Sequence, residues 1–285
     1  MTDRGVVAVV PAFHPDTPVV DLVASLIGQV DRVVVVVDGA DALSGPLRGG
    51  LETAGATVVW HAENRGIAAA LNTGVREAPD AWAVLTVDQD STVRDGFVDG
   101  LRAGWERATA AGLRVGLVAP ERVTGIPSQV TSRRLGVPLG RDPVQSGLLI
   151  PLATLHAVGE FDERLFIDGV DADFALRCLD IGLVVVIAEG LELGHRLGDA
   201  HTVRIAGLRV ELTRSRPFRY YYLVRNRAWL VARHGRRHPV WAVGQAAGLV
   251  RHLALVQALV PGRTERTRHM WRAARDVGRS IRPRG

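Results

Sequence analysis

The sequence contains no lysine and only one cysteine, and each absence narrows what the protein can be. All 35 basic residues are arginines, and the formal net charge is +5. The single Cys178 provides neither a disulfide framework nor a cysteine metal site, a composition expected in a reducing compartment. The N-terminus has no basic segment followed by a long apolar run. We therefore expect a cytoplasmic protein without a secretory signal.

The first half of the chain alternates between short apolar runs and segments with helical periodicity. The 285 residues are 47% apolar, which is ample for a buried core. Predicted strands cover residues 6–10, 33–37, 57–60 and 82–87, and predicted helices cover residues 20–27 and 67–77. Alternating strands and helices favour an open, mostly parallel sheet, in which ligands bind beyond the carboxyl ends of the strands.

Two carboxylates, Asp88 and Asp90, directly follow the fourth predicted strand. Because alternate residues of an extended chain point to the same side, both side chains could approach one cation or one nucleotide-sugar. Mg²⁺ commonly binds one or two carboxylates together with substrate phosphates. The alternative interpretation is an acidic strand-to-turn junction without a ligand.

Further motifs follow in a fixed order along residues 6–200. They are the strand ending at Asp38, the run 64–74 beginning Asn64-Arg65-Gly66, the tetrapeptide Asp88-Gln89-Asp90-Ser91, the pair Ser146-Gly147, and the segments 159–163 and 168–177. Together they resemble the family 2 glycosyltransferases, which are inverting enzymes. The Asp-Gln-Asp-Ser form, with Val-Asp in the later segment, is similar to bacterial rhamnosyltransferases.

The resemblance implies a fold and a division of the chain. The fold class is α/β, the GT-A nucleotide-diphospho-sugar transferase fold, with a mostly parallel central sheet flanked by helices and a helical C-terminal extension. Residues 1–125 would form the nucleotide-sugar-binding half, residues 126–205 the acceptor-binding and catalytic half, and residues 206–285 the basic helical extension. Residues 131–145 show little periodicity and are interpreted as a mobile active-site loop.

The same resemblance assigns the donor and the metal. The donor would be a nucleotide-diphospho-sugar, with dTDP-rhamnose favoured and another sugar such as galactofuranose as the alternative. Mg²⁺ or Mn²⁺ would bind Asp90, with His195 completing the site. A loop histidine could equally hydrogen-bond to a phosphate or to the backbone. The predicted nucleotide-sugar-binding residues are Pro11, Asp38, Asn64, Gly66, Asn72 and Asp88.

Asp171 is the predicted general base, since it matches the aspartate of the family's Glu-Asp motif. An acceptor hydroxyl is a poor nucleophile, and a nearby carboxylate must take its proton. Acidic residues in the first turn of a helix also complement the helix dipole, so Asp171 and Asp173 have a purely structural alternative. Ser146, Gly147 and Arg225 are candidates for contacts with the acceptor or a phosphate.

Arginines are frequent after about position 200, where the chain is expected to be helical. The predicted acceptor is a cell-surface glycan or a lipid-linked glycan, and the basic extension would contact an anionic membrane surface peripherally. The apolar stretch 239–261 contains Arg251 and His252 near its middle, which argues against a transmembrane helix. A nucleic-acid-binding protein and a nucleotidyltransferase are the alternative functions, although we expect no nucleic acid as partner.

Overall fold

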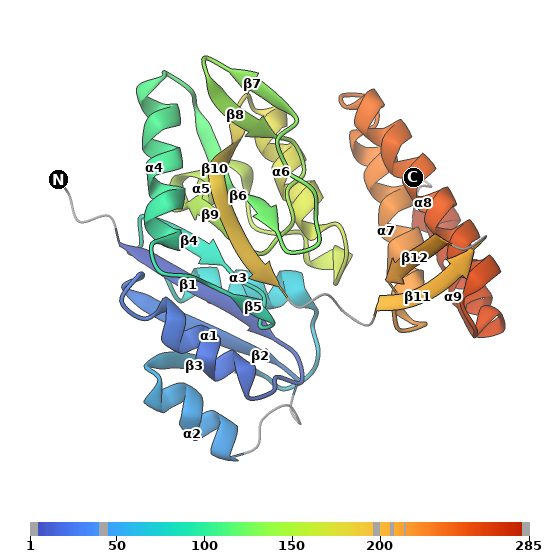
Figure 1. Cartoon of the computed structure of the whole chain (residues 1–285), viewed down its shortest axis with the longest axis horizontal. Coiled ribbons are helices and arrows are strands. Elements are labelled where there is room, and N and C mark those ends of the chain that lie inside the picture. Colours follow the sequence, from blue (N-terminus) through green and yellow to red (C-terminus); the bar gives the residue numbers. More distant parts are fainter. Residues whose placement is uncertain (1–4, 40–44, 196–199, 206–207, 214, 281–285) are drawn as a thin grey trace. The chain divides into compact units, whose positions relative to one another are not determined.

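Five consecutive valines, residues 33–37, form the middle of strand β2 (Arg32–Asp38), and all five side chains are fully buried. Burial on both faces is typical of a central parallel strand. The computed structural model describes residues 5–39, 45–195, 200–205, 208–213 and 215–280. In it β2 pairs in parallel with β1 (Val6–Ala12) and β3 (Ala56–His61), and β1 also pairs with β4 (Ala83–Thr86). The four predicted strands are confirmed (Figure 1).

The sheet continues beyond β4 with strands of mixed direction. Its order is β3-β2-β1-β4-β9-β6-β10-β8-β7, and β5 pairs with β10 outside this path. The later strands are β5 (Ser91–Thr92), β6 (Val115–Val123), β7 (Ser132–Arg134), β8 (Val137–Gly140), β9 (Leu148–Pro151) and β10 (Val184–His195). Because β1 to β4 are mutually parallel, their carboxyl ends meet at one edge.

Helices cover both faces of this sheet (Figure 1). The helices of this part are α1 (Pro18–Leu26), α2 (Gly45–Thr53), α3 (Ile67–Arg76), α4 (Phe97–Ala110), α5 (Leu152–Val158) and α6 (Val170–Asp180). Val6, Ala8 and Val10 of β1 share one core with residues of α1, α2 and α4. Val9 points to the opposite face of the strand, and a Cβ added at Gly74 of α3 would collide with its side chain. Glycine at position 74 therefore lets α3 lie directly on β1.

Residues 132–140 form a hairpin within the segment 131–145 that was predicted to be a loop. Strands β7 and β8 pair in antiparallel fashion, with Ser132 opposite Leu139. The turn between them places Leu135 and Gly136 at φ angles of 51° and 77°. Two positive φ angles are typical of the tight turns that join hairpin strands, although leucine is an unusual residue for the first of them. The loop interpretation is therefore wrong for residues 132–140, and a role of the whole segment as a mobile part of the active site stays a prediction.

The chain divides into two compact units. The first comprises residues 1–166 and 170–196, and the second comprises residues 167–169 and 197–285. The second unit contains β11 (Ala200–Ile205), β12 (Leu208–Thr213), α7 (Arg219–His234), α8 (Pro239–Leu259) and α9 (Arg263–Ser280). The three helices confirm the helical extension, but β11 and β12 form an antiparallel hairpin where helix was expected. Residues 208–213 alternate between apolar and polar types, which favours a strand.

The short segment 167–169 is held by α7 within the second unit. Nδ2 of Asn226 donates to the carbonyl oxygens of Ile167, at 2.6 Å, and Asp168, at 2.9 Å. The guanidinium of Arg219 donates to the Asp168 carboxylate, with Nη2 2.7 Å from Oδ1. Asp168 itself has a φ angle of 65°. Two side chains of α7 thus fix a backbone conformation that is uncommon for a residue other than glycine.

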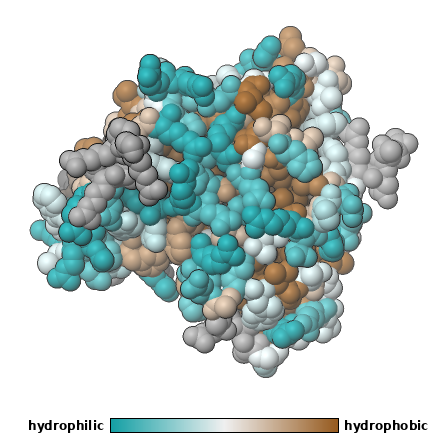
Figure 2. Space-filling view, turned by 180° about the vertical axis from the view of Figure 1, so that it is seen from behind, coloured by the Kyte–Doolittle hydropathy of each residue, from teal (hydrophilic) through white to brown (hydrophobic). Residues whose placement is uncertain are grey.

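The outer surface mixes apolar and polar areas, and the single thiol is buried. On the face that Figure 2 shows, hydrophobic areas are separated by hydrophilic ones. Among the helices described, none combines the length and the apolar content that crossing a bilayer requires. Burial raises the pKa of the Cys178 thiol to about 12, so this group stays protonated at neutral pH and is a poor nucleophile.

Candidate active site

Gln89, between Asp88 and Asp90, connects the end of β1 to the Asp88–Ser91 motif. Its Oε1 accepts a hydrogen bond from the backbone N–H of Phe13 at 2.8 Å, and its Nε2 donates to the Phe13 carbonyl oxygen at 3.2 Å. The next residue, His14, has a φ angle of 46°. Gln89 thereby sets the path of the chain just beyond Pro11, which is buried in β1. Sequence reasoning did not assign a role to Gln89.

Ser146 supports the same motif from the segment before β9. Its Oγ accepts a hydrogen bond from the Asp88 backbone N–H at 2.9 Å and lies 2.8 Å from Oγ of Ser91. Ser146 is buried, and Gly147 donates its N–H to the Thr86 carbonyl oxygen at 2.7 Å. The geometry gives Ser146 and Gly147 a role in positioning the carboxylate motif. Their predicted contact with an acceptor or a phosphate stays a prediction.

The backbone of His195 lies beside the carboxylate motif. Strand β10 pairs with β5 in antiparallel fashion, and the register sets His195 opposite Ser91. Ser91 directly follows Asp90. The two segments that the sequence analysis joined in one metal site are thus neighbours in the sheet. The side chain of His195 lies outside the described part of the structure, so its role as a ligand stays a prediction.

Asp38, at the end of β2, organises the loop that precedes α3. Its Oδ1 accepts from the Arg65 N–H at 2.8 Å, and its Oδ2 accepts from the Gly66 N–H at 2.7 Å. Nδ1 of His61 also lies 2.8 Å from Oδ1 of Asp38, because the parallel register places the two residues side by side. Asp38 is buried. Its predicted contact with the nucleotide base would have to share a carboxylate that already accepts several hydrogen bonds.

His61 was missed in the sequence analysis. Its Nε2 lies 2.9 Å from Oγ1 of Thr73, so the ring connects β2 with α3. With a neutral ring, Nδ1–H donates to the carboxylate of Asp38 and Nε2 accepts from the hydroxyl. The sequence signal for His61 was its position directly after the predicted strand 57–60. Asp38 holds the same position after the preceding predicted strand, 33–37.

Gly66 is the point where the loop before α3 meets the segment before α6. Its backbone has φ 89° and ψ 163°. A Cβ added there would lie 2.5 Å from the carbonyl oxygen of Phe166, and that same oxygen accepts a hydrogen bond from the Ile67 N–H at 2.8 Å. Asn64 accepts a further hydrogen bond from the Gly66 N–H at its Oδ1, at 3.0 Å. The close approach of two backbones therefore requires glycine.

We expect Gly66→Ala to lower both stability and donor affinity. The strained backbone alone costs about 1–3 kcal/mol for a residue with a side chain, and the collision with Phe166 adds to it. Urea denaturation measures the loss of stability. Gly96→Ala is the matched control, because Gly96 also has a positive φ angle, 76°, but a Cβ there meets nothing within 4 Å. Equal losses in the two variants would contradict the role given to the Phe166 contact.

The side chain of Asn72 is buried and hydrogen-bonded to other parts of the protein. It is 1% exposed, and its Nδ2 donates to the Phe161 carbonyl oxygen at 2.9 Å and to Oε1 of Glu163 at 3.0 Å. Its Oδ1 accepts from the Phe161 N–H at 2.9 Å. The amide is therefore occupied in holding the segment that leads to α6. Its predicted contact with a nucleotide-sugar stays a prediction and would have to share an amide that is already hydrogen-bonded.

Asp171 and Asp173 occupy the first turn of α6 in different surroundings. Asp171 is half-buried, and its Oδ1 accepts from the Ala172 N–H at 2.8 Å. Asp173 is fully buried and pairs with Arg177, whose Nε lies 2.8 Å from Oδ2. Arg177 also donates to the carbonyl oxygens of Val158, at 2.8 Å, and Glu160, at 2.9 Å. Asp173 is thus a structural residue, while the carboxylate of Asp171 is the more accessible of the two.

Arg225, the third candidate for an acceptor contact, is engaged within α7. Its guanidinium lies 4.9 Å from the ring centroid of Tyr222 and 5.3 Å from that of Tyr221, and its Nε donates to Oδ1 of Asn226 at 2.8 Å. Its predicted contact with the acceptor or a phosphate stays a prediction.

The two carboxylates at the strand edge fit a divalent metal ion. Asp88 and Asp90 are half-buried carboxylates at the end of β4, and oxygen ligands of this kind suit Mg²⁺ and Mn²⁺. Within the described ranges, no group of three or more histidine, cysteine, aspartate or glutamate side chains could hold an ion. One or two carboxylates are nevertheless the usual protein contribution to a Mg²⁺ site that also includes substrate phosphates.

Comparison with known proteins agrees with this architecture. Residues 7–137 match the model of the family "Glycosyl transferase family 2". The chain is 26% identical over 279 residues to the dTDP-rhamnosyl transferase RfbF of Shigella flexneri, covering 92% of each chain.

Two solved structures share the fold. The structure of S. aureus TarS 1-349 in complex with UDP-GlcNAc is 15% identical, with a TM-score of 0.56, and the match covers 98% of this chain and 82% of that one. The structure of GalNAc-T7 with UDP, GalNAc and Mn²⁺ is 14% identical, also with a TM-score of 0.56. That match covers 71% of this chain and only 44% of GalNAc-T7.

The sheet has the GT-A fold of these solved glycosyltransferases. Residues 7–137 thus match a family 2 glycosyltransferase domain, and over most of its length the chain is similar to a rhamnosyltransferase.

Proposed function

We propose that the protein transfers rhamnose from dTDP-rhamnose to a hydroxyl group of a cell-surface glycan or lipid-linked acceptor, with inversion at the anomeric carbon. The observation that carries this proposal is the 26% identity to a dTDP-rhamnosyl transferase, which extends over 92% of both chains. The match includes the C-terminal unit, so it is not limited to the nucleotide-sugar-binding fold that many transferases share.

The nucleotide end of the donor would bind at the carboxyl edge of β1, β2 and β4. Asp38 and Gly66 shape one side of this edge through the loop before α3, and Gln89 shapes the other side through Phe13. Asp88 would contact the nucleotide-sugar. Preformed hydrogen bonds between these segments reduce the ordering that binding would otherwise require.

Asp90 and His195 would hold the divalent metal, with Asp88 close by. The metal, when bound, would supply positive charge to the diphosphate of the donor. The chain's own part is to hold the motif at the end of β4, and the hydrogen bond from the Asp88 N–H to Ser146 contributes to this.

Asp171 would accept the proton of the attacking hydroxyl group. The acceptor oxygen would attack the anomeric carbon from the face opposite the nucleoside diphosphate, which leaves as the new glycosidic bond forms. A carboxylate within hydrogen-bond reach typically contributes about 10²–10⁴-fold to such a step. The Asp173–Arg177 pair would keep the first turn of α6 in place.

Helix α8 is the segment that we propose for peripheral contact with an anionic membrane surface at the inner face of the cell membrane. Three of its valines, Val240, Val243 and Val250, are exposed by 78%, 70% and 67%, and their spacing of three and seven residues places them on one side of the helix. Co-sedimentation with phosphatidylglycerol vesicles tests this contact. Replacing the three valines with serine should abolish it, and unchanged sedimentation would reject α8 as the contact.

The decisive experiment is calorimetric titration of a panel of nucleotide-sugars, comprising dTDP-rhamnose, UDP-galactofuranose and UDP-GlcNAc. Each is titrated with Mg²⁺, with Mn²⁺ and with a chelator. We expect dTDP-rhamnose to bind most tightly and only with metal. Preference for another sugar nucleotide would reject the proposed donor, and no binding of any of the three would reject the donor site itself.

A further inference from the structure

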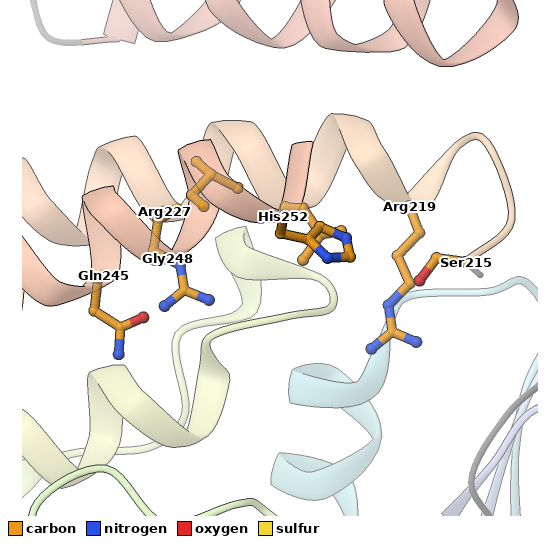
Figure 3. A pocket seen from close by; sticks show the side chains of 8 residues that line it. Ser215, Arg219, Arg227, Gln245, Gly248 and His252 are labelled. Atoms are coloured by element: carbon orange, nitrogen blue, oxygen red, sulfur yellow. The ribbon is translucent and has the colours of Figure 1, made fainter. Parts of the chain in front are cut away.

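The C-terminal unit contains a pocket between α7 and α8 that the donor site does not use. It has a volume of about 290 Å³, and its lining includes Arg219, Leu223, Arg227, Gln245, Leu249 and His252. In Figure 3 the side chains of Arg227 and Gln245 lie at one end, those of Arg219 and Ser215 lie at the other, and the His252 ring lies between them. All the lining residues belong to the same unit.

The polar lining of this pocket favours an anion. Two guanidinium groups face it, and none of the described residues that line it is acidic. Arg219 is already paired with Asp168. Arg227 forms no hydrogen bond or ion pair with any residue that the structure describes, although it is only partly exposed. A guanidinium in this situation is well suited to a phosphate oxygen, which it can bind through two parallel hydrogen bonds.

The size and the apolar wall of the pocket restrict the ligand further. Small-molecule sites usually have volumes of about 300–1,000 Å³, so this pocket lies at the lower end of the range and suits a compact group rather than a whole nucleotide-sugar. Leu223 and Leu249 add apolar surface. Gly248 also lines the pocket, and a Cβ added there meets nothing within 4 Å, so the open space reaches the backbone of α8.

We propose that this pocket binds a diphosphate group that carries an apolar substituent. Arg227 and Arg219 would contact the phosphate oxygens from the two ends, and Ser215 and Gln245 would add neutral hydrogen bonds. The leucines would contact the substituent. An isoprenoid diphosphate and a free diphosphate share this chemistry, and two probes distinguish them. Every lining residue belongs to the C-terminal unit, so binding can be measured separately from the transfer reaction. An isoprenoid diphosphate as the ligand rests on the proposed function, because it would be the carrier of a lipid-linked acceptor, whereas binding of a free diphosphate does not.

The two probes, farnesyl diphosphate and inorganic pyrophosphate, test the pocket in calorimetric titrations of the full chain. A chelator is present throughout, so that metal-dependent binding at the donor site does not contribute. We expect Arg227→Gln to weaken binding about tenfold or more, as the loss of a charged hydrogen bond does. Arg251→Gln is the matched control, because Arg251 is an exposed arginine of α8 that does not line the pocket. It should bind as the native chain does.

A second pair of variants separates occupancy of the pocket from loss of charge. Gly248→Leu should fill the pocket and block both probes without loss of stability, since leucine has a higher helix propensity than glycine. Gly244→Leu is its control, because Gly244 is exposed on the same helix and lies outside the pocket. Tighter binding of farnesyl diphosphate than of pyrophosphate would assign the site to an isoprenoid diphosphate, and equal binding would assign it to a free diphosphate. No binding of either probe, or equal weakening by a variant and its control, would overturn the proposal.

Discussion

Asp171→Asn is expected to lower kcat by about 10²–10⁴-fold, the contribution of a positioned general base. Asparagine keeps the size of the side chain and its hydrogen bond with the Ala172 N–H, but it cannot accept the proton of the acceptor hydroxyl. Donor binding should therefore change little. Steady-state kinetics with dTDP-rhamnose and a glycan acceptor, together with calorimetric titration of the donor, separate the two effects.

Asp99→Asn is the matched control for that experiment. Asp99 is an exposed aspartate in the first turn of α4, as Asp171 is an aspartate in the first turn of α6. Both substitutions remove a charge that complements a helix dipole, which contributes about 0.3–1 kcal/mol to stability. If the two variants lost the same stability and Asp171→Asn kept its activity, Asp171 would be a helix-terminus residue and the general base would lie elsewhere.

Asp90→Asn is expected to weaken metal-dependent binding of the donor by about 10–100-fold, because a charged ligand is replaced by a neutral one. The effect should appear in the binding of Mn²⁺ in the presence of dTDP, followed by electron paramagnetic resonance, as well as in activity. With a chelator present, the variant and the native chain should bind the donor equally. This readout separates a metal-binding role from a purely structural one.

Asp95→Asn serves as its control, since Asp95 is an exposed aspartate five residues further along the chain. It should bind Mn²⁺ and dTDP as the native protein does. Native affinity in the Asp90 variant would contradict the assignment of Asp90 to the metal, and the carboxylate motif would then be a strand-to-turn junction.

The four leading strands could be predicted because their sequences carry strong local signals. The valines of β2 are buried on both faces, and no other regular structure explains such a run as simply. The β7–β8 hairpin was missed because its turn begins with Leu135, a residue that rarely adopts a positive φ angle. The hairpin is also supported by pairing with a distant strand, β10, which local sequence does not reveal.

Site residues were harder to predict than strands, because their roles depend on partners far along the chain. Asn72 was expected at the ligand, but its amide is hydrogen-bonded to Phe161, 89 residues away. Gln89 was overlooked between two aspartates, and its partner, Phe13, lies 76 residues earlier. Only the fold brings such pairs together, so sequence patterns indicate the edge where the site lies better than they indicate the role of each side chain.

The hydrogen bonds from α7 to residues 167–169 limit how the protein can be shortened. Asp171 follows this segment by two residues in the chain, yet Arg219 lies 51 residues beyond its partner Asp168, and Asn226 lies 59 residues beyond Ile167. A fragment ending at residue 196 would retain every predicted donor-site residue but leave the carbonyl groups of Ile167 and Asp168 without those hydrogen bonds. An expression fragment must therefore include the C-terminal unit. A chimaera that exchanged this unit for another would have to supply equivalent hydrogen bonds to residues 167–169.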